Sequence, residues 1–272
     1  MAARFLRLEF ARGEDEDLLV AELWAAGTLG VESRDDRLLA YFEESSPPRG
    51  EWRSRGVGPI SSEEVEDEDW MAAYRERARP LEIGRRLLVD PGEPGDRKLE
   101  APDRLVLRVP ARTAFGTGAH ESTRLVLEWL EEVDLSRLRL LDVGFGSGVL
   151  SLAAIGWGAA TVVGIEIDPV AALVGGQNRA LNELHPRLVA GGVACLGGEG
   201  LFDLALVNVL PHRIAGDLAE IRRVVASGGR AFFSGIVNEV SEEVEKRLGA
   251  EGFRAVGRRR LEEWVALVTV AG

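Results

Sequence analysis

The chain has 272 residues, 33 of them basic and 45 acidic, which gives a formal net charge of −12 with neutral histidines. With 46% hydrophobic and 29% charged residues it has the composition of a soluble globular protein, which excludes disordered and collagen-like chains. The acidic balance argues against direct nucleic-acid binding, because that binding depends on clustered lysine and arginine. An acidic surface instead suits a basic protein partner.

Targeting and redox signals indicate a cytoplasmic protein. Cys195 is the single cysteine, so no intrachain disulfide can form, and no Cys/His set has zinc-ligand spacing. Residues 1–10 alternate arginine with apolar residues and do not form a signal peptide. Residues 143–165 are uncharged, but repeated glycines predict a strand, turn, helix and strand in place of a membrane span. The basic cluster 258–260 is interpreted as a solvated strand end.

The first 60 residues predict a small α+β domain. Leu6, Leu8 and Phe10 alternate with charged residues, which is typical of a half-buried strand. A helix is expected over 14–26, followed by strands at 30–33 and 38–42. This order suggests a split βαβ, ferredoxin-like arrangement.

Residues 61–103 are interpreted as a helix, a strand and an interdomain linker. An acidic run from 63 to 69 precedes basic residues at 75–79, the charge order that a helix dipole favours. Residues 81–89 predict one strand, and the Pro/Gly-rich segment 90–96 predicts the domain boundary.

From residue 104 onward, short apolar strands alternate with helices. This pattern predicts an α/β domain whose parallel sheet is covered on both faces. The expected strands are 138–143, 161–167, 204–209 and 230–234, and the expected helices are 149–156, 169–184, 214–225 and 239–250. The segments 253–259 and 264–270 predict a final antiparallel hairpin.

The sharpest motif is DVGFGSG at residues 142–148, which follows a strand and opens a helix. A glycine-rich turn there lets the backbone approach a ligand closely. The dinucleotide fingerprint needs a glycine where Val149 stands, and the Asp142 carboxylate suits an ammonium group better than a pyrophosphate. The motif favours S-adenosylmethionine over a nicotinamide or flavin nucleotide. The residues predicted to hold it are Asp142, Gly144, Gly146 and Gly148.

The next strand supplies a second carboxylate. Glu166 follows Gly144 by about 20 residues, the spacing expected for an acidic residue that binds ribose hydroxyls. Asp168 competes for this role, but its position before Pro169 is typical of a helix N-cap. Glu166 is therefore the predicted ribose ligand.

Asn208 ends an apolar strand, where open α/β sheets bind ligands. A buried amide there can accept a hydrogen bond from a substrate amine and hold the amine's lone pair toward an electrophilic methyl group. Asn208 is thus the candidate catalytic residue and a candidate cofactor contact. The alternative is a turn asparagine before Pro211.

The segment FGTGAHEST at residues 115–123 precedes a helix rich in leucine. Its glycines and small residues predict a loop that folds over a ligand, with Phe115 and Thr117 as candidate cofactor contacts. Thr123 lies at the helix start, where a hydroxyl either caps backbone amides or reaches a ligand carboxylate. His120 is either a base or, as is more common for a lone loop histidine, a structural residue.

Together these motifs resemble the bacterial ribosomal protein methyltransferases that modify the L-eleven stalk-base protein. The resemblance also rests on Asp69-Trp70, Tyr74-Arg75, Pro80, Ile83-Gly84, the strand end at 207–210 and residues 234–236. It covers nearly the whole chain and is weakest over residues 1–60. The departures from the family pattern are Phe145, Glu166 and Pro211-His212.

The resemblance implies a recognition domain, a linker and a Rossmann-like class I methyltransferase domain at 104–272 with a mostly parallel seven-stranded sheet. It also implies methyl transfer from S-adenosylmethionine to lysine and N-terminal amines of a basic ribosomal protein, by an enzyme we expect to be monomeric. The positions that match the family's cofactor contacts are Thr123, Gly144, Glu166 and Asn208. Three alternatives stay open: a methyltransferase of another protein or a small amine, a nicotinamide-nucleotide oxidoreductase, and a binding protein without activity.

Overall fold

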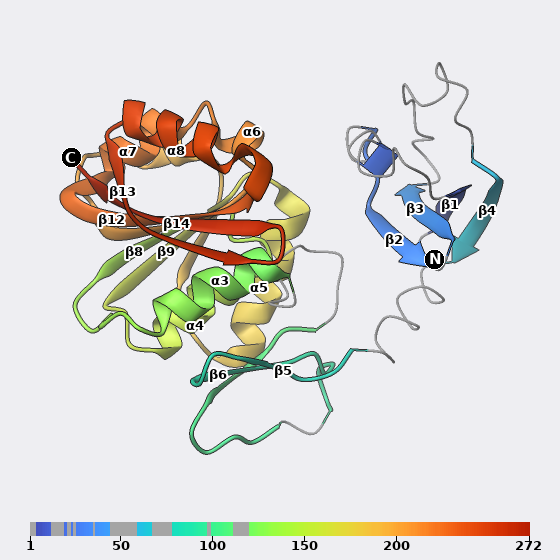
Figure 1. The fold of residues 1–272 in the computed structure, drawn as a ribbon. Coiled ribbons are helices and arrows are strands. Elements are labelled where there is room, and N and C mark those ends of the chain that lie inside the picture. The colour runs from blue at the N-terminus through green and yellow to red at the C-terminus, as the bar shows by residue number, and fades with distance from the viewer. Residues whose placement is uncertain are drawn as a thin grey trace. The chain divides into compact units, whose positions relative to one another are not determined.

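The computed structural model describes residues 4–11, 19, 20, 23, 26–34, 36–43, 59–66, 78–96, 99–110 and 120–272. The chain divides into two compact units, residues 1–78 and 79–272 (Figure 1). The three-part division at residues 60 and 103 that the sequence suggests stays a prediction.

The first unit contains a four-stranded sheet in the order β2-β3-β1-β4. Its strands are β1 (Arg4–Ala11), β2 (Gly30–Arg34), β3 (Arg37–Glu43) and β4 (Ser61–Glu66). All three pairings are antiparallel, and the alternation predicted for β1 places Leu8 and Phe10 in the core. Leu19 and Leu23, from the predicted helix 14–26, are helical where described and pack into the same core.

The acidic run does not begin a helix at residue 63, so that part of the prediction is wrong. Residues 61–66 form β4, which pairs with β1 along its length. Glu63 lies opposite Arg7 and its carboxylate accepts a hydrogen bond from Arg7 Nη2 at 2.6 Å. Pairing with β1 along the strand, to which this cross-strand charge pair adds, outweighs the local preference of the acidic run. Residues 67–77 lie outside the described residues.

The second unit begins with a three-stranded sheet in place of the single strand expected at 81–89. Strands β5 (Leu81–Ile83) and β6 (Leu87–Asp90) form an antiparallel hairpin, and β7 (Leu105–Arg108) pairs parallel to β6. The one-strand prediction is wrong because Gly84 turns the chain, with φ +54° in the left-handed region that favours glycine.

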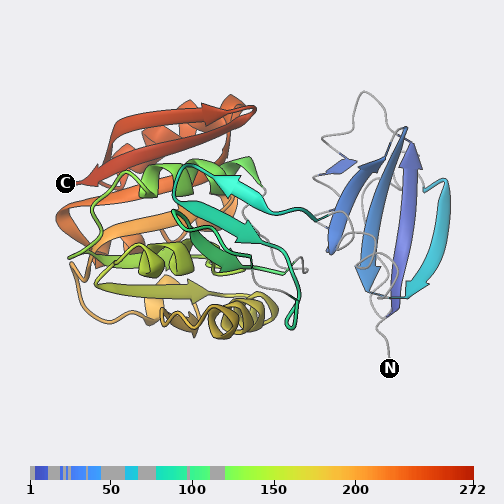
Figure 2. The same ribbon diagram turned by 90° about the horizontal axis from the view of Figure 1, so that it is seen from below.

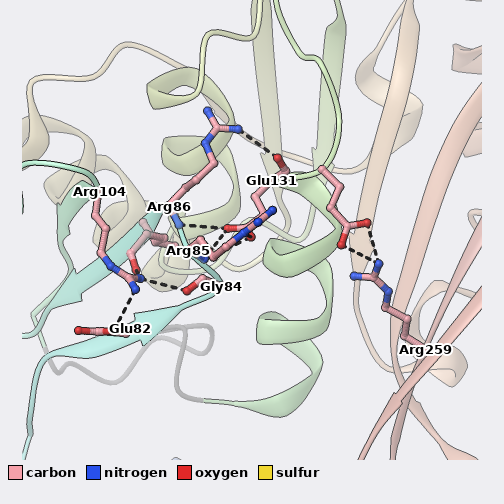
Figure 3. A network of polar contacts seen from close by, with 9 residues as sticks. Glu82, Gly84, Arg85, Arg86, Arg104, Glu131 and Arg259 are labelled. Atoms are coloured by element: carbon pink, nitrogen blue, oxygen red, sulfur yellow. Dashed lines mark hydrogen bonds and ion pairs between the residues drawn. The ribbon is translucent and has the colours of Figure 1, made fainter.

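The turn of this hairpin is held by a carboxylate from the C-terminal end of a helix that lies far along the sequence (Figure 3). The backbone amides of Arg85 and Arg86 donate to Glu131, with distances from 3.0 to 3.2 Å. Arg104 donates to the carbonyl oxygen of Gly84 at 3.0 Å from the other side. The sequence separation of these groups explains why the hairpin is hard to predict from local patterns.

A seven-stranded sheet forms the centre of the second unit, in the order β10-β9-β8-β11-β12-β14-β13. The strands are β8 (Arg139–Val143), β9 (Thr161–Glu166), β10 (Arg187–Ala190), β11 (Phe202–Asn208), β12 (Val225–Val237), β13 (Phe253–Leu261) and β14 (Trp264–Ala271). The first four pairings are parallel, while β12-β14 and β14-β13 are antiparallel. The prediction of a mostly parallel sheet that closes with an antiparallel hairpin is confirmed.

Helices cover both faces of this sheet (Figures 1 and 2). They are α3 (Glu121–Leu130), α4 (Val149–Gly156), α5 (Pro169–Asn182), α6 (Pro211–Ile214), α7 (Leu218–Val224) and α8 (Ser241–Ala250). Neighbouring residues of β8 point to opposite faces, so Leu140 packs in the core with α3 and α4, while Leu141 packs in the core with α7 and α8. The helix expected at 214–225 is split into α6 and α7 around Gly216.

Residues 143–165 form the end of β8, a turn, α4 and most of β9, as predicted. Within the described parts of the chain, no helix is both long and apolar enough to span a membrane.

The strand order reverses between β8 and β11. From β8 the chain passes to β9 and β10 on one side, and it returns to β11 on the other side of β8. In open α/β sheets such a switch point, at the carboxyl ends of the strands, forms the ligand crevice. The predicted site residues at the ends of β8, β9 and β11 therefore belong to one edge of the sheet.

Candidate active site

The glycine loop (residues 144–148) depends on backbone conformations that favour glycine. Gly144, Gly146 and Gly148 have φ values of +70°, +51° and +79°. A Cβ atom at Gly144 would also lie only 2.6 Å from Cγ2 of Val209. The three glycines predicted from the sequence are thus required by the loop itself.

Most backbone amides of the glycine loop already have partners within the protein. The amide of Gly144 donates to the carbonyl of Ile165 at 2.8 Å, and that of Gly148 donates to Phe145 at 2.7 Å. The amide of Gly146 donates to the Glu166 carboxylate at 3.0 Å. These groups do not offer the row of free amides that binds a pyrophosphate, which argues against the dinucleotide alternative.

Asp142 is fully buried at the end of β8. The hydroxyl of Ser151 donates to its Oδ2 at 2.6 Å, whereas Oδ1 is buried without a hydrogen-bond partner. Burial raises the pKa of Asp142 to about 7, an effect that the Ser151 hydrogen bond opposes and the nearby Glu166 charge increases. A buried carboxyl with one free oxygen can pair with a ligand ammonium group, which would favour its ionised form.

Glu166, at the end of β9, is held by two backbone amides. Its Oε2 accepts from Gly146 and its Oε1 from Asp168, both at 3.0 Å. A carboxylate has about four acceptor sites, so it can still accept hydrogen bonds from ribose hydroxyls. Asp168 caps α5 by accepting from the amides of Val170 at 2.8 Å and Ala171 at 3.4 Å, which confirms the predicted N-cap.

Asn208 and Thr123 meet across 85 residues of sequence. Nδ2 of Asn208 donates to Oγ1 of Thr123 at 3.0 Å, and Thr123 is fully buried at the start of α3. The helix start is itself held by Ser234, whose hydroxyl donates to the carbonyl of Ser122 at 3.0 Å. Oδ1 of Asn208 is buried without a hydrogen-bond partner, so it is free to accept from a ligand.

His120 is the N-cap of α3. Its Nδ1 accepts from the backbone amide of Ser122 at 3.3 Å and lies 2.8 Å from the Ser122 hydroxyl. Its ring packs edge-on against Trp264, with centroids 4.5 Å apart, and burial lowers its pKa. These contacts support the structural interpretation of this histidine.

Some predicted positions lie outside the described residues. Phe115 and Thr117 are two of them, together with the motif residues Asp69-Trp70 and Tyr74-Arg75. The segment 190–200 runs from the end of β10 through the short 3-10 helix η2 (Val193–Cys195). It is tied to the site because the amide of Gly191 donates to the carbonyl of Glu166 at 2.8 Å.

Sequence reasoning missed several buried polar residues that support the site. Ser151 bonds to Asp142, and Asn178 donates from Nδ2 to the carbonyl of Ser147 at 2.9 Å. Both are fully buried on helices. Their signal was a polar residue on the apolar face of a helix, where an unpaired group would be costly.

The sheet order, the glycine loop and the carboxylates at the switch point together define the class: a Rossmann-like class I methyltransferase that uses S-adenosylmethionine. The buried free oxygens of Asp142 and Asn208 fit a ligand with cationic and donor groups.

Comparisons with known proteins identify the family. The family model "Ribosomal protein L11 methyltransferase (PrmA)" matches residues 13–271. The ribosomal protein L11 methyltransferases of Geobacter sulfurreducens and Pelobacter propionicus are 40% and 33% identical to this chain, covering 88% and 98% of it and 83% and 82% of their own lengths. The chain belongs to the ribosomal protein L11 methyltransferase family.

A solved structure shows the same fold. The crystal structure of the ribosomal protein L11 methylase of Lactobacillus delbrueckii subsp. bulgaricus matches with a TM-score of 0.62 at 24% identity. The match covers 71% of this chain and 98% of that one.

Proposed function

We propose that this chain transfers methyl groups from S-adenosylmethionine to lysine side-chain and N-terminal amines of ribosomal protein L11. The family membership supports the ribosomal protein as substrate. One observation supports an amine as the group that receives the methyl. Oδ1 of Asn208, at the carboxyl end of β11, is a buried hydrogen-bond acceptor without a partner. An amine N–H is a donor of the kind that this oxygen lacks.

The bound cofactor supplies an electrophilic methyl group. Asn208 accepts a hydrogen bond from the amine, and the hydrogen bond to Thr123 fixes the direction of the Asn208 side-chain amide. This orientation turns the nitrogen lone pair toward the methyl carbon, which is a positioning contribution. A nitrogen–carbon bond forms as the sulfur–carbon bond breaks, and the excess proton on nitrogen passes to water.

The cofactor is assigned to the residues at the switch point. Asp142 would receive its ammonium group, Glu166 its ribose hydroxyls, and the glycine loop would pass close beneath it. The remaining proposed contacts are Thr123, Asn208, Phe115 and Thr117. The hydrogen bonds of Asp142, Glu166 and Asn208 support this assignment, because each side chain is held in place and retains acceptor capacity.

We assign substrate recognition to the first unit and propose that it is ferredoxin-like. Its antiparallel order β2-β3-β1-β4 supports this, because a split βαβ unit places the third strand between the first two. A monomeric, cytoplasmic enzyme that does not bind nucleic acid itself fits the acidic charge of −12 and a basic protein substrate.

The test is to incubate the full chain with purified ribosomal protein L11 and methyl-labelled cofactor, then locate the label by mass spectrometry. We expect label on lysine side chains and on the N-terminal amine. Label found only on another ribosomal protein or a small amine would overturn the proposed substrate. No transfer by a protein that binds the cofactor would indicate a binding protein without activity.

A further inference from the structure

Helix α5 presents one face to the glycine loop. Gly175, Asn178 and Asn182 are spaced by three and four residues, so they lie on the same side of the helix. Gly175 and Asn178 are buried, whereas the neighbouring Gly176 is half-buried. The contacts of these three positions lead to the glycine loop or to strand β7.

The glycine loop approaches α5 closely at Gly175. A Cβ atom there would lie 2.6 Å from Cε2 of Phe145 and 2.8 Å from the carbonyl oxygen of Gly146. Gly164 in β9 leaves space for the same ring, because its Cβ would lie 2.9 Å from Cδ1 of Phe145. Two glycines thus accommodate the ring of Phe145. A glycine inside a helix is unfavourable on its own, and this close approach explains it.

Asn178 holds the loop by a hydrogen bond. Its Nδ2 donates to the carbonyl of Ser147 at 2.9 Å, directly before the left-handed Gly148. Both Asn178 and Ser147 are almost fully buried. Water therefore has little access to replace this bond, so its loss would be costly.

Asn182 extends the same face to β7. Its Oδ1 accepts from the backbone amide of Arg108, and its Nδ2 donates to the carbonyl of Arg108, both at 2.7 Å. Nδ2 also donates to the carbonyl of Asn178 at 2.8 Å. Arg108 is anchored in turn by its ion pair with Asp90 at 2.9 Å. The face of α5 is thus fixed at both ends.

We propose that Gly175, Asn178 and Asn182 are positioning residues that set the conformation of the glycine loop for binding S-adenosylmethionine. The inference rests on the proposed cofactor site. It assigns to a face of α5 a role in cofactor affinity that needs no direct contact with the cofactor.

The experiment compares two neighbouring glycines of the full-length protein. Gly175→Ala forces a methyl group against Phe145 and Gly146, whereas Gly176→Ala meets nothing within 4 Å. Calorimetric titration with S-adenosylhomocysteine measures binding without turnover. We expect Gly175→Ala to raise the dissociation constant by about tenfold or more, because small displacements of binding groups have large effects. Gly176→Ala should leave it within about twofold of wild type.

A second pair keeps the inference testable if Gly175→Ala does not fold. Asn178→Leu removes the bond to Ser147 at similar side-chain size, and Thr269→Val removes a similar buried bond, from a hydroxyl to the carbonyl of Ala231 at 3.1 Å. We expect Asn178→Leu to raise KM for the cofactor about tenfold while kcat at saturating cofactor changes less. Thr269→Val should lower the melting temperature without changing KM.

The outcomes separate the inference from the proposed function. Folded Gly175→Ala and Asn178→Leu proteins that bind S-adenosylhomocysteine as tightly as wild type would overturn the inference alone. A wild-type protein that does not bind this molecule would overturn the proposed cofactor site. A rise in KM for Thr269→Val equal to that for Asn178→Leu would show a general stability effect and would also overturn the inference.

Discussion

The two sides of the switch point differ in how their polar groups are satisfied. Two carboxyl groups lie at the ends of β8 and β9. That of Asp142 accepts a hydrogen bond from Ser151, and that of Glu166 accepts from two backbone amides. At the end of β11, Asn208 and Thr123 form one neutral side-chain pair. The first side is charged and tied to the glycine loop, whereas the second is uncharged and tied to the start of α3.

This difference separates two tasks. A charged side can hold a ligand with an ammonium group and hydroxyls, because carboxylates accept strong hydrogen bonds. A neutral amide can orient an amine while stabilising its protonated form, which has no lone pair to react, less than a carboxylate would. We therefore expect substitutions on the charged side to change mainly cofactor affinity. Substitutions on the neutral side should change mainly turnover, with a smaller effect on affinity because Asn208 and Thr123 are also proposed cofactor contacts.

The largest effect is expected on the neutral side. Asn208→Ala should lower kcat by about 100-fold, because the amine loses its orienting acceptor. The dissociation constant of S-adenosylhomocysteine should change much less. Rapid-quench measurement of methyl transfer checks the rate, with Thr269→Val as a control for the loss of a buried polar group. Turnover that survives in Asn208→Ala at the wild-type level would disprove the orienting role.

On the charged side, Glu166→Gln should weaken cofactor binding by about tenfold. The substitution keeps the size of the side chain but removes the charge and leaves fewer acceptor positions for two amides and the ribose hydroxyls. Calorimetry should report the loss in affinity, while kcat at saturating cofactor stays within a few-fold of wild type. A change in kcat without a change in affinity would contradict the division of tasks.

Asp142 gives a pH-dependent test of the same side. A cationic ligand group favours the ionised carboxylate, so cofactor affinity should rise with pH, by up to about tenfold per pH unit below pH 7. Titrations in buffers of different ionisation enthalpy would detect the proton released on binding. Asp142→Asn should weaken binding and remove this pH dependence.

The raised pKa of Asp142 also predicts how the stability of the fold changes with pH. The pKa of Asp142 is raised from 3.8 to about 7, so between these values the folded state binds more protons than the unfolded state. Its contribution to stability is therefore largest at low pH and is lost as the pH rises from about 4 to about 7. Denaturant titrations of wild type and Asp142→Asn should show this difference in slope, and parallel pH profiles would refute it.

The smallest effect is expected outside both sides of the site. Gly176→Ala should raise the free energy of unfolding by about 0.5 to 1 kcal/mol, since alanine favours the helix and no atom lies within 4 Å of its Cβ. Denaturant unfolding measures this change. A destabilised Gly176→Ala protein would mean that α5 has less space there than the structure shows.

Local patterns predicted much of the fold of the second unit. Strand and helix alternation located β8, β9, β11 and the helix α4, because these elements are buried apolar segments with clear ends. The prediction failed at residues 61–66 and 81–89. In the first case the pairing of β4 with β1 decided the structure, and in the second a glycine turn held by Glu131 did. Both depend on residues far away in the sequence.

The sequence alone determined the features that depend on local backbone chemistry. The glycine loop needs left-handed backbone conformations, which only glycine adopts easily. Asp168 before Pro169 caps the helix through amides no more than three residues away. Tertiary structure decided which polar atoms remain free. Asn208 meets Thr123 across 85 residues and keeps its Oδ1 unpaired. Burial is the main cause of the raised pKa of Asp142, and the nearby Glu166 charge adds to it. Hydrogen-bond satisfaction and desolvation depend on what surrounds a group in space, so only the folded chain fixes them.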